Sequence, residues 1–364
     1  MTTPKDVQAL VKRGQEIAKG QLQGMDFRGM DLSGAIFINT DLSGADLSDA
    51  QVNGSTFLDC RWSGAVLERA KADQCFFRGG DATGMQMRGA TLEDSHFYDM
   101  LLSDACFDGV KTGVLGFSDC DLGAASFRAI ESEMLVFYGG KLDRSDFSGS
   151  LLQRTTFFES DLRTAIFDRC RFDKTIFIES DLSGQSFRGQ EFELCQFTDA
   201  QLRNCDFEGA RLNQCNFKGA KFEGASLRRV IAPQCVFVAA DMNGIACSGG
   251  DFAQSVWVDA QLRKADFSGA NLEQCMFHRT QCAGAVFPDA RLSHADFSYA
   301  DLRDADLRTA TLMRTKVHRT LLENTRFSDR GGLLQNDPAL FAAEEFSARR
   351  PKHRGERGPQ GRPA

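Results

Sequence analysis

The residues of this chain that are capable of chemistry are its cysteines and histidines. The 364 residues include 12 cysteines and five histidines. Thiolates and imidazoles are the usual zinc ligands, and a cysteine beside a histidine is a common nucleophile and base. No two cysteines have the C-x-x-C spacing of a zinc site, and no histidine lies in a nucleophile or metal motif: His96, His278, His294, His318 and His353. The sequence therefore predicts no catalytic residue, no cofactor and no metal, and we do not expect an enzyme.

A strict five-residue register organises the chain instead. Residues whose numbers end in 2 or 7 are large and apolar with few exceptions, from Leu22 to Phe327, and those ending in 0 or 5 are mostly Ala, Ser, Thr, Cys or Gly. The run contains 62 consecutive units without an insertion. Neither the helical period of 3.6 nor the strand period of 2 fits this pattern. A period of five indicates a chain that turns a corner every five residues.

Each unit is expected to point its large and its small residue inward and the other three outward. One turn cannot bury its own core, so successive turns must stack. Cys247 and Cys282 fill the large slot, and only Cys106 is expected to point outward. A buried thiol packs as a small hydrophobe, so we interpret the cysteines as structural. Nine of them fill the small inward slot: Cys60, Cys75, Cys120, Cys170, Cys195, Cys205, Cys215, Cys235 and Cys275.

Units such as Ala45-Asp46-Leu47-Ser48 and Ser145-Asp146-Phe147-Ser148-Gly149 make residues 20–328 resemble the pentapeptide-repeat family. The resemblance implies an all-β solenoid, a right-handed quadrilateral parallel β-helix with four units in each coil. The repeat then makes about 15 coils, and a strand spacing of ~4.8 Å gives a rod about 75 Å long. Positions ending in 7 are mostly Phe and those ending in 2 mostly Leu. Phe should therefore line two opposite faces and Leu the other two.

The chain divides into four segments. Residues 1–20 are predicted to form a capping helix, because Thr3-Pro4-Lys5-Asp6 combines an N-cap, a proline at the first helical position and an acidic third position. The helical spacing of Val7, Leu10, Val11 and Ile17 would pack it on the first coil. Residues 21–328 are predicted to form the β-helix.

Residues 329–349 contain a second predicted helix, which begins at Asp337-Pro338. Its apolar face, made by Leu340, Phe341 and Phe346, either covers the last coil or pairs with another molecule. Residues 350–364 are rich in Gly, Pro and Arg and are predicted to be a disordered basic tail. The tail either binds an acidic surface or is simply solvated.

The charge and hydropathy of the chain limit its partners. The net charge is −7, and because residues 349–364 carry +5, residues 1–348 carry −12. An acidic body argues against direct binding of nucleic acid, which requires Lys and Arg. No stretch of 18 apolar residues is present, and the N-terminus lacks the apolar region of a signal peptide. We expect a cytoplasmic protein that binds neither membrane nor small-molecule substrate.

One of the four faces differs from the others in its outward residues. The three remaining faces carry mostly Asp, Glu, Lys, Arg and Ser, whereas the face centred on Phe37, Phe57, Phe77 and Phe97 carries apolar side chains and also His96 and His278. We call these apolar side chains the apolar stripe: Ile36, Ile38, Leu58, Phe76, Tyr98, Val136, Tyr138, Phe158, Ile176, Ile178, Val236, Val238, Val256, Val258 and Met276.

The apolar stripe is interpreted as a protein interface. Strand propensity favours β-branched and aromatic residues, but it does not explain why they gather on one face of four. A stripe of roughly 500 Å² is large enough to mark an interaction site. Gaps at Gly116 and Ser118 and from Gln196 to Lys218 would divide it into segments. The partner is either a different protein or a second copy of this one.

Two functions are compatible with these features. The first is a non-enzymatic protein-binding scaffold or adaptor. Residues 10–35 resemble segments of bacterial type VI secretion accessory proteins, which implies a secreted effector or a secretion component as the partner. The second is a DNA mimic that modulates DNA gyrase or topoisomerase, as some pentapeptide-repeat proteins do. The acidic rod favours the mimic, whereas the interspersed Lys and Arg and the apolar face argue against it.

Thr112 and Ser132 put polar residues where a large apolar residue belongs. The coils there should be distorted, either for function or as a tolerated irregularity.

Overall fold

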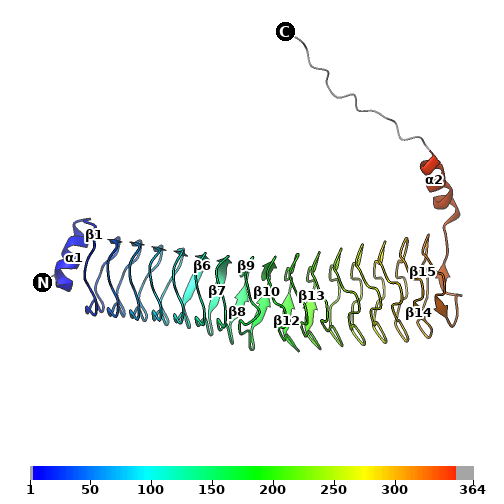
Figure 1. Cartoon of the computed structure of the whole chain (residues 1–364), viewed down its shortest axis with the longest axis horizontal. Coiled ribbons are helices and arrows are strands. Elements are labelled where there is room, and N and C mark those ends of the chain that lie inside the picture. The colour runs from blue at the N-terminus through cyan, green and yellow to red at the C-terminus, as the bar shows by residue number, and fades with distance from the viewer. Residues whose placement is uncertain (1–2, 350–364) are drawn as a thin grey trace, which may run out of the picture.

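A computed structural model describes residues 3–349 and shows a rod of stacked coils with one helix at each end (Figure 1). The predicted basic tail, 350–364, lies outside the described residues. Each coil pairs in parallel with the next one along the chain, from Ile17 opposite Phe37 to Asp306 opposite Arg326. The predicted fold is confirmed: a right-handed quadrilateral parallel β-helix of about 16 turns. It exceeds the predicted 15 turns because pairing begins at Ile17 and continues to Leu334.

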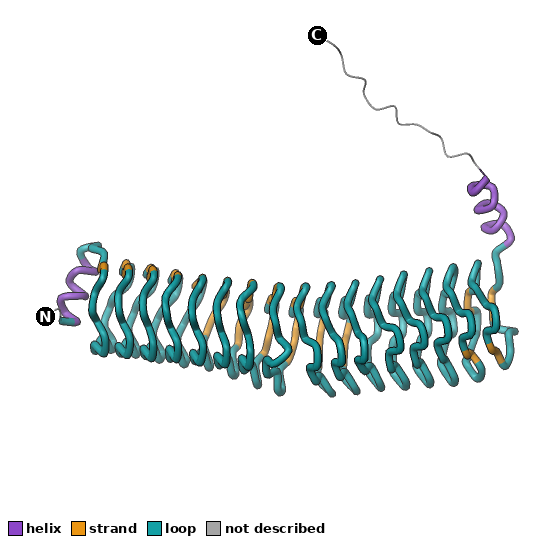
Figure 2. Tube along the Cα trace, viewed as in Figure 1, coloured by secondary structure: helices purple, strands orange, loops and turns teal. Residues whose placement is uncertain are grey.

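We name the four sides by the residues at their centres. Face A is centred on Phe37, Phe57 and every twentieth residue after them, face B on Leu42, face C on Leu47 and face D on Val52, each with the same repeat. Strands occupy only short parts of the coils, and turns make up most of the rest (Figure 2). The strands are β1 Ile17–Ala18, β2 Ile36–Ile38, β3 Thr56–Leu58, β4 Phe76–Arg78, β5 Ser95–Tyr98, β6 Lys111–Ser118, β7 Glu131–Tyr138, β8 Leu151–Gln153, β9 Thr156–Phe158, β10 Arg171–Asp173, β11 Ile176–Ile178, β12 Glu191–Glu193, β13 Arg211–Asn213, β14 Asp306–Leu307, β15 Thr315–Lys316, β16 Arg326–Phe327 and β17 Leu333–Leu334.

Left-handed residues make the corners. Nearly every residue whose number ends in 4 or 9 has a positive φ, for example 64° at Gly44 and 58° at Asp49. Val114 and Met134 do not, and β6 and β7 therefore run extended across the corner between faces D and A. Val is β-branched and disfavours the left-handed region. These are the coils of Thr112 and Ser132, so the predicted distortion is present there.

Stacked aromatic rings fill the interior. On face A the rings of Phe77 and Phe97 lie parallel with centroids 4.5 Å apart, and the stack continues along the rod. Phe107 and Phe127 on face C stack at 5.0 Å. The two stacks meet edge to face, as Phe97 and Phe107 do at 83°. Each ring therefore packs on neighbours in three directions, which explains the strong preference for Phe in the large slot.

The small inward slot has its own bonding rule. The hydroxyl or thiol in this slot usually donates a hydrogen bond to a backbone carbonyl of the preceding coil. The acceptor is each time the residue 23 positions earlier in the chain. Ser95 Oγ lies 2.7 Å from the Ala72 oxygen, and Cys235 Sγ lies 2.7 Å from that of Leu212. Gln185 follows the rule despite its size, with Nε2 2.7 Å from the Leu162 oxygen. Ser, Thr and Cys are thus interchangeable here because each supplies one small donor.

Both predicted helices are present. α1, Pro4–Lys12, has the predicted capping box between Thr3 and Asp6 and buries Val7 and Val11. Ile17 belongs to β1 and not to the helical pattern, because the helix ends at Lys12. α2, Pro338–Arg349, begins where Asp337 Oδ1 accepts bonds from the backbone of the next turn.

The twelve cysteines are free and buried. Eleven belong to the core, and Cys106 lies outside it as predicted, yet it is only 8% exposed because Arg88 approaches its sulfur to 3.8 Å. Burial raises the pKa of Cys75 and Cys170 to about 12.

We expect the cysteine thiols to be unreactive in the folded protein, because all of them are buried away from the reagent. Only the thiolate reacts, and the raised pKa of residues such as Cys75 and Cys170 also reduces the thiolate fraction at neutral pH. Maleimide labelling at pH 7.5 should be slow and begin at Cys106, whereas unfolding in guanidinium should expose all 12 sites. Rapid labelling of several core cysteines in the native state would contradict this packing.

Replacing Phe137 by Ala should lower the free energy of unfolding by about 3–5 kcal/mol, because a cavity would open between stacked neighbours. Phe137 is buried, with Phe117 and Phe157 stacked at 5.3 and 5.1 Å. Urea unfolding measures the change. Ile166→Ala on face C is the control, and since Ile166 is 43% exposed we expect a change within about 0.5 kcal/mol.

Candidate protein interface

All fifteen residues of the apolar stripe lie on face A, in two outward columns of one parallel ladder. One column flanks the buried Phe on its N-terminal side and runs from Ile36 through Phe76 to Met276. The other flanks it on the C-terminal side, with Ile38 opposite Leu58 and Tyr138 opposite Phe158. Neighbouring members stand one strand spacing apart, so the register brings together residues from most of the chain.

These side chains are accessible. Tyr138 is 51% exposed, Met276 44% and Ile36 42%, and the remaining members are exposed or half-buried. Tyr138 and Phe158 stack with centroids 5.1 Å apart on the outside of the rod. The outward surface therefore repeats the aromatic stacking of the interior, but on the side that faces solvent.

The predicted gap at Gly116 is partly filled by its neighbour. His96 stacks on Phe76 and places Nε2 3.1 Å from Ser118 Oγ in the following coil. A Cβ at residue 116 would lie 2.3 Å from His96 Nδ1, so glycine makes room for the ring. Burial lowers the pKa of His96, which favours a neutral imidazole at this point of the stripe.

The polar segment from Gln196 to Lys218 divides the stripe, as predicted. Between Ile36 and His278 the two outward columns contain no Asp or Glu, and their only permanent charges are Arg78 and Lys218. Face A is thus apolar and almost uncharged along most of its length.

The other faces are dominated by ion pairs. On face B, Arg163 and Asp161 lie 2.6 Å apart, and on face C, Arg308 and Asp306 lie 2.7 Å apart. The bonds from Arg308 lower the pKa of Asp306 to about 2. Exposed apolar residues on these faces, such as Leu101 and Ile166, stand singly.

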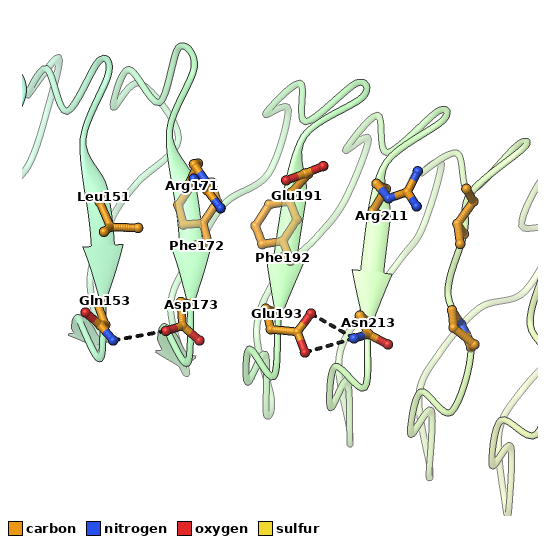
Figure 3. A pocket seen from close by; sticks show the side chains of 12 residues that line it. Leu151, Gln153, Arg171, Phe172, Asp173, Glu191, Phe192, Glu193, Arg211 and Asn213 are labelled. Atoms are coloured by element: carbon orange, nitrogen blue, oxygen red, sulfur yellow. Dashed lines mark hydrogen bonds between the residues drawn. The ribbon is translucent and has the colours of Figure 1, made fainter.

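Face D contains a shallow groove that the sequence did not reveal (Figure 3). Its volume is about 740 Å³, and it lies over β8, β10, β12 and β13. Arg171, Glu191 and Arg211 line one side, and Gln153 bonded to Asp173 and Glu193 bonded to Asn213 line the other. The buried Phe172 and Phe192 form its floor. The lining is mixed in charge and its groups do not converge on one point, unlike those of an active site.

A second concavity, about 770 Å³, lies where the chain leaves face A. It is lined by the ends of the two outward columns and by the segment that leads into α2. Asp296 lies there with His278 Nε2 and Lys316 Nζ each at 3.4 Å. Sequence reasoning missed this feature because residues 333–340 have no repeat register.

Glu344 of α2 fastens the helix to the rod. It accepts bonds from Tyr299, His318 and Arg319, and the guanidinium of Arg319 lies 4.1 Å from the Phe341 ring centre. Of the predicted apolar face, Phe341 makes these contacts, whereas Leu340 is 48% and Phe346 62% exposed. The helix therefore stands beside the last coils and projects from the rod (Figure 1).

Among residues 3–349 no cluster of His, Cys, Asp and Glu has the arrangement of a metal site. Within the same residues, neither helix has the length and hydropathy required to span a bilayer.

Family models match the repeat region. A model described as pentapeptide repeats in eight copies matches residues 21–49, 45–84, 275–312 and 290–329, one in nine copies matches 186–231, and a pentapeptide repeat region model matches 210–287. Together these matches cover more than half of the chain. No curated protein sequence gives a significant match.

Solved structures give similarities to the fold. Trypsin-treated QnrB1, a plasmid-mediated fluoroquinolone resistance protein, is 24% identical over 59% of this chain and 96% of its own, with a TM-score of 0.29. HetL from the cyanobacterium Nostoc, which is involved in regulating heterocyst differentiation, is 18% identical over 85% of this chain and 97% of its own, with a TM-score of 0.16. The register, the coil geometry and the family matches agree, and the chain belongs to the pentapeptide-repeat family.

Proposed function

We propose that this protein is a non-enzymatic scaffold or adaptor that binds another protein chain through the apolar stripe on face A. The observation that carries the proposal is the concentration of exposed apolar side chains on one face, while the other faces carry ion pairs. Members of this family are generally structural or binding proteins rather than enzymes.

The physical argument is the removal of apolar surface from water. Each square ångström of apolar area that is buried contributes about 25 cal/mol, and association must first overcome lost rotational and translational freedom. Rigid coils help, because the stripe needs no ordering before it binds. The aromatic rings of Tyr98, Tyr138 and Phe158 would be the anchors, since aromatic residues dominate binding energy at interfaces.

The resemblance of residues 10–35 to type VI secretion accessory proteins supports a particular class of partner. In that setting the partner is a secreted effector or a component of the secretion machinery, and the two proteins meet in the cytoplasm.

Introducing charge into the stripe should abolish binding. The triple variant Tyr138→Asp/Ile176→Asp/Val256→Asp is expected to weaken capture of partner proteins from a bacterial lysate at least tenfold, because each change costs about 1 kcal/mol or more at a packed interface. The matched control is Leu101→Asp/Leu151→Asp/Ile166→Asp, which alters exposed apolar residues on the other three faces.

Both triple variants should retain the wild-type circular dichroism spectrum and melting temperature within a few degrees. Recovery of the same proteins by the stripe variant and the wild type would overturn the proposal.

A DNA mimic is the alternative function, and the net charge of −12 on residues 1–348 favours it. A mimic needs an ordered negative potential along the rod. Here the outward carboxylates are interrupted by arginines that bond to them, as in the Asp26–Arg28, Asp161–Arg163 and Asp301–Arg303 pairs. These pairs neutralise much of the field that the carboxylates would otherwise generate.

We therefore expect micromolar protein to leave DNA gyrase supercoiling unchanged in a gel assay. Reversing Arg163 and Arg303 to Glu should not create inhibition, since face A remains apolar. Inhibition by the wild type that fades as salt is raised would favour the mimic instead.

A further inference from the structure

We infer that the occupant of the apolar stripe is a second copy of this chain, docked face A to face A with the two rods antiparallel. The inference rests on the proposed function, because it names the partner of the same surface. We label each coil by the number of the residue at its face A centre, so that coil 157 carries the outward residues Thr156 and Phe158.

The outward residues of face A are arranged symmetrically about coil 157. Three apolar coils, 137 to 177, lie at the centre. Polar coils flank them: coil 117 with Gly116 and Ser118 on one side, and coil 197 with Gln196 and Thr198 on the other. The next pair is less alike, because coil 97 carries His96 and Tyr98, whereas its mirror, coil 217, carries the polar Asn216 and Lys218. Farther out, the predominantly apolar coils 37 to 77 mirror coils 237 to 277 at the same distance from the centre.

In the proposed dimer a two-fold axis passes through coil 157 along the strand direction. Because the pattern is symmetric about this coil, apolar coils of one subunit then face apolar coils of the other. The axis places each coil opposite its mirror image in the partner and keeps each outward column facing itself. Ile36 then meets Met276, Leu58 meets Val258 and Phe76 meets Val236. A closed dimer with this axis uses the same patch on both subunits, which is the commonest form of protein assembly.

Polar groups also find suitable partners in this register. Ser118 faces Thr198, and Gln196 faces Gly116, beside the His96 ring that lies over the glycine. Lys218 faces the ring of Tyr98, which provides a cation–π contact. At the ends Glu16 faces Asp296, but Lys316 Nζ lies 3.4 Å from that carboxylate and offsets its charge.

Displacement by one coil destroys the match. Sliding the partner one coil in one direction puts Ile36 opposite Asp296 and Tyr138 opposite Thr198. Sliding it the other way puts Arg78 opposite Lys218 and Ile176 opposite Gly116. The pattern therefore selects one antiparallel register.

The competing arrangement has parallel rods, in which every coil faces itself. α2 opposes it, because the helix projects from the end of face A (Figure 1), held there by Glu344. Parallel docking would bring two such helices into the same space. In the antiparallel dimer the two α2 helices lie at opposite ends of the assembly, so they do not meet.

The area is adequate for a stable dimer. From coil 17 to coil 297 the shared face is roughly 65 Å long at ~4.8 Å per coil and roughly 10 Å wide. That gives roughly 650 Å² from each subunit, close to the ~800 Å² of a standard interface. Neither half of the stripe alone reaches this area, which requires the full length of the rod.

The edges of the interface provide an independent signature. In the antiparallel dimer Asp119 lies near Asp199 of the partner subunit, and Glu159 near Glu159 of the partner subunit, along one edge. These charges are exposed and about a Debye length apart, so their repulsion is weak and is reduced by salt. Parallel rods would instead bring Glu159 near Arg154 and Glu179 near Lys174. Salt should therefore strengthen the antiparallel dimer and would weaken the parallel one.

The first test is the mass of the full chain in solution. Light scattering during gel filtration at about 50 μM should give the mass of a dimer, and the Tyr138→Asp/Ile176→Asp/Val256→Asp variant that of a monomer. Raising the salt from about 50 to about 300 mM should tighten the wild-type dimer severalfold. Leu101→Asp/Leu151→Asp/Ile166→Asp should remain dimeric.

The second test fixes the orientation. Facing sheets stand ~10 Å apart, too far for a disulfide, so a short bismaleimide is the probe. Ile38→Cys mixed with His278→Cys should give crosslinked dimers, whereas Ile38→Cys alone should not. The buried native cysteines do not compete.

Crosslinking of Ile38→Cys to itself would overturn the antiparallel arrangement. A wild-type monomer at these concentrations would overturn self-pairing altogether. If that monomer still captures another protein and loses it in the stripe variant, the proposed function stands and only this inference fails.

Discussion

The structure depends on one constraint: each coil must offer its backbone hydrogen bonds to the next coil along the chain, always in the same register. The left-handed residue at each corner brings the chain back into that register, so an extended corner such as the one at Val114 immediately produces a longer strand. Because the offset is constant, any property that recurs once in every coil becomes a column on the surface. The Phe stacks and the apolar stripe are the inward and outward results of the same geometry.

Most of the fold could be predicted from the sequence because the register is uninterrupted. The position of each residue in the five-residue register was enough to place the cysteines in inward slots and the apolar stripe on one face. The structure has these residues at those positions. Prediction failed where the register ends. Ile17 looked like part of a helix, and the position of α2 depends on Glu344, whose partners lie in distant coils. Nor did the pattern reveal how Gln185 fits an inward slot: its amide reaches the carbonyl that a serine would bond.

The surface of the rod separates two kinds of chemistry. On faces B and C carboxylates and guanidinium groups satisfy each other within one or two coils, so little free energy remains for a partner. Along most of face A the exposed side chains are apolar and form no such ion pairs, so burial against another apolar surface is their most favourable outcome. This contrast supports an interface more strongly than the exposure of any single residue, because it holds along the length of the rod.

The hydrogen bond from each small inward side chain to the preceding coil has an evolutionary consequence. Ser95, Cys235 and even Gln185 donate to the equivalent carbonyl of the preceding coil. A duplicated coil would therefore make the same hydrogen bonds to its neighbours wherever it was inserted in the stack. Growth and shortening by whole coils are therefore easy for the fold. A surface pattern that is symmetric about one coil does not share this freedom, because every added block moves its midpoint, and selection on that surface would hold the gene at one length.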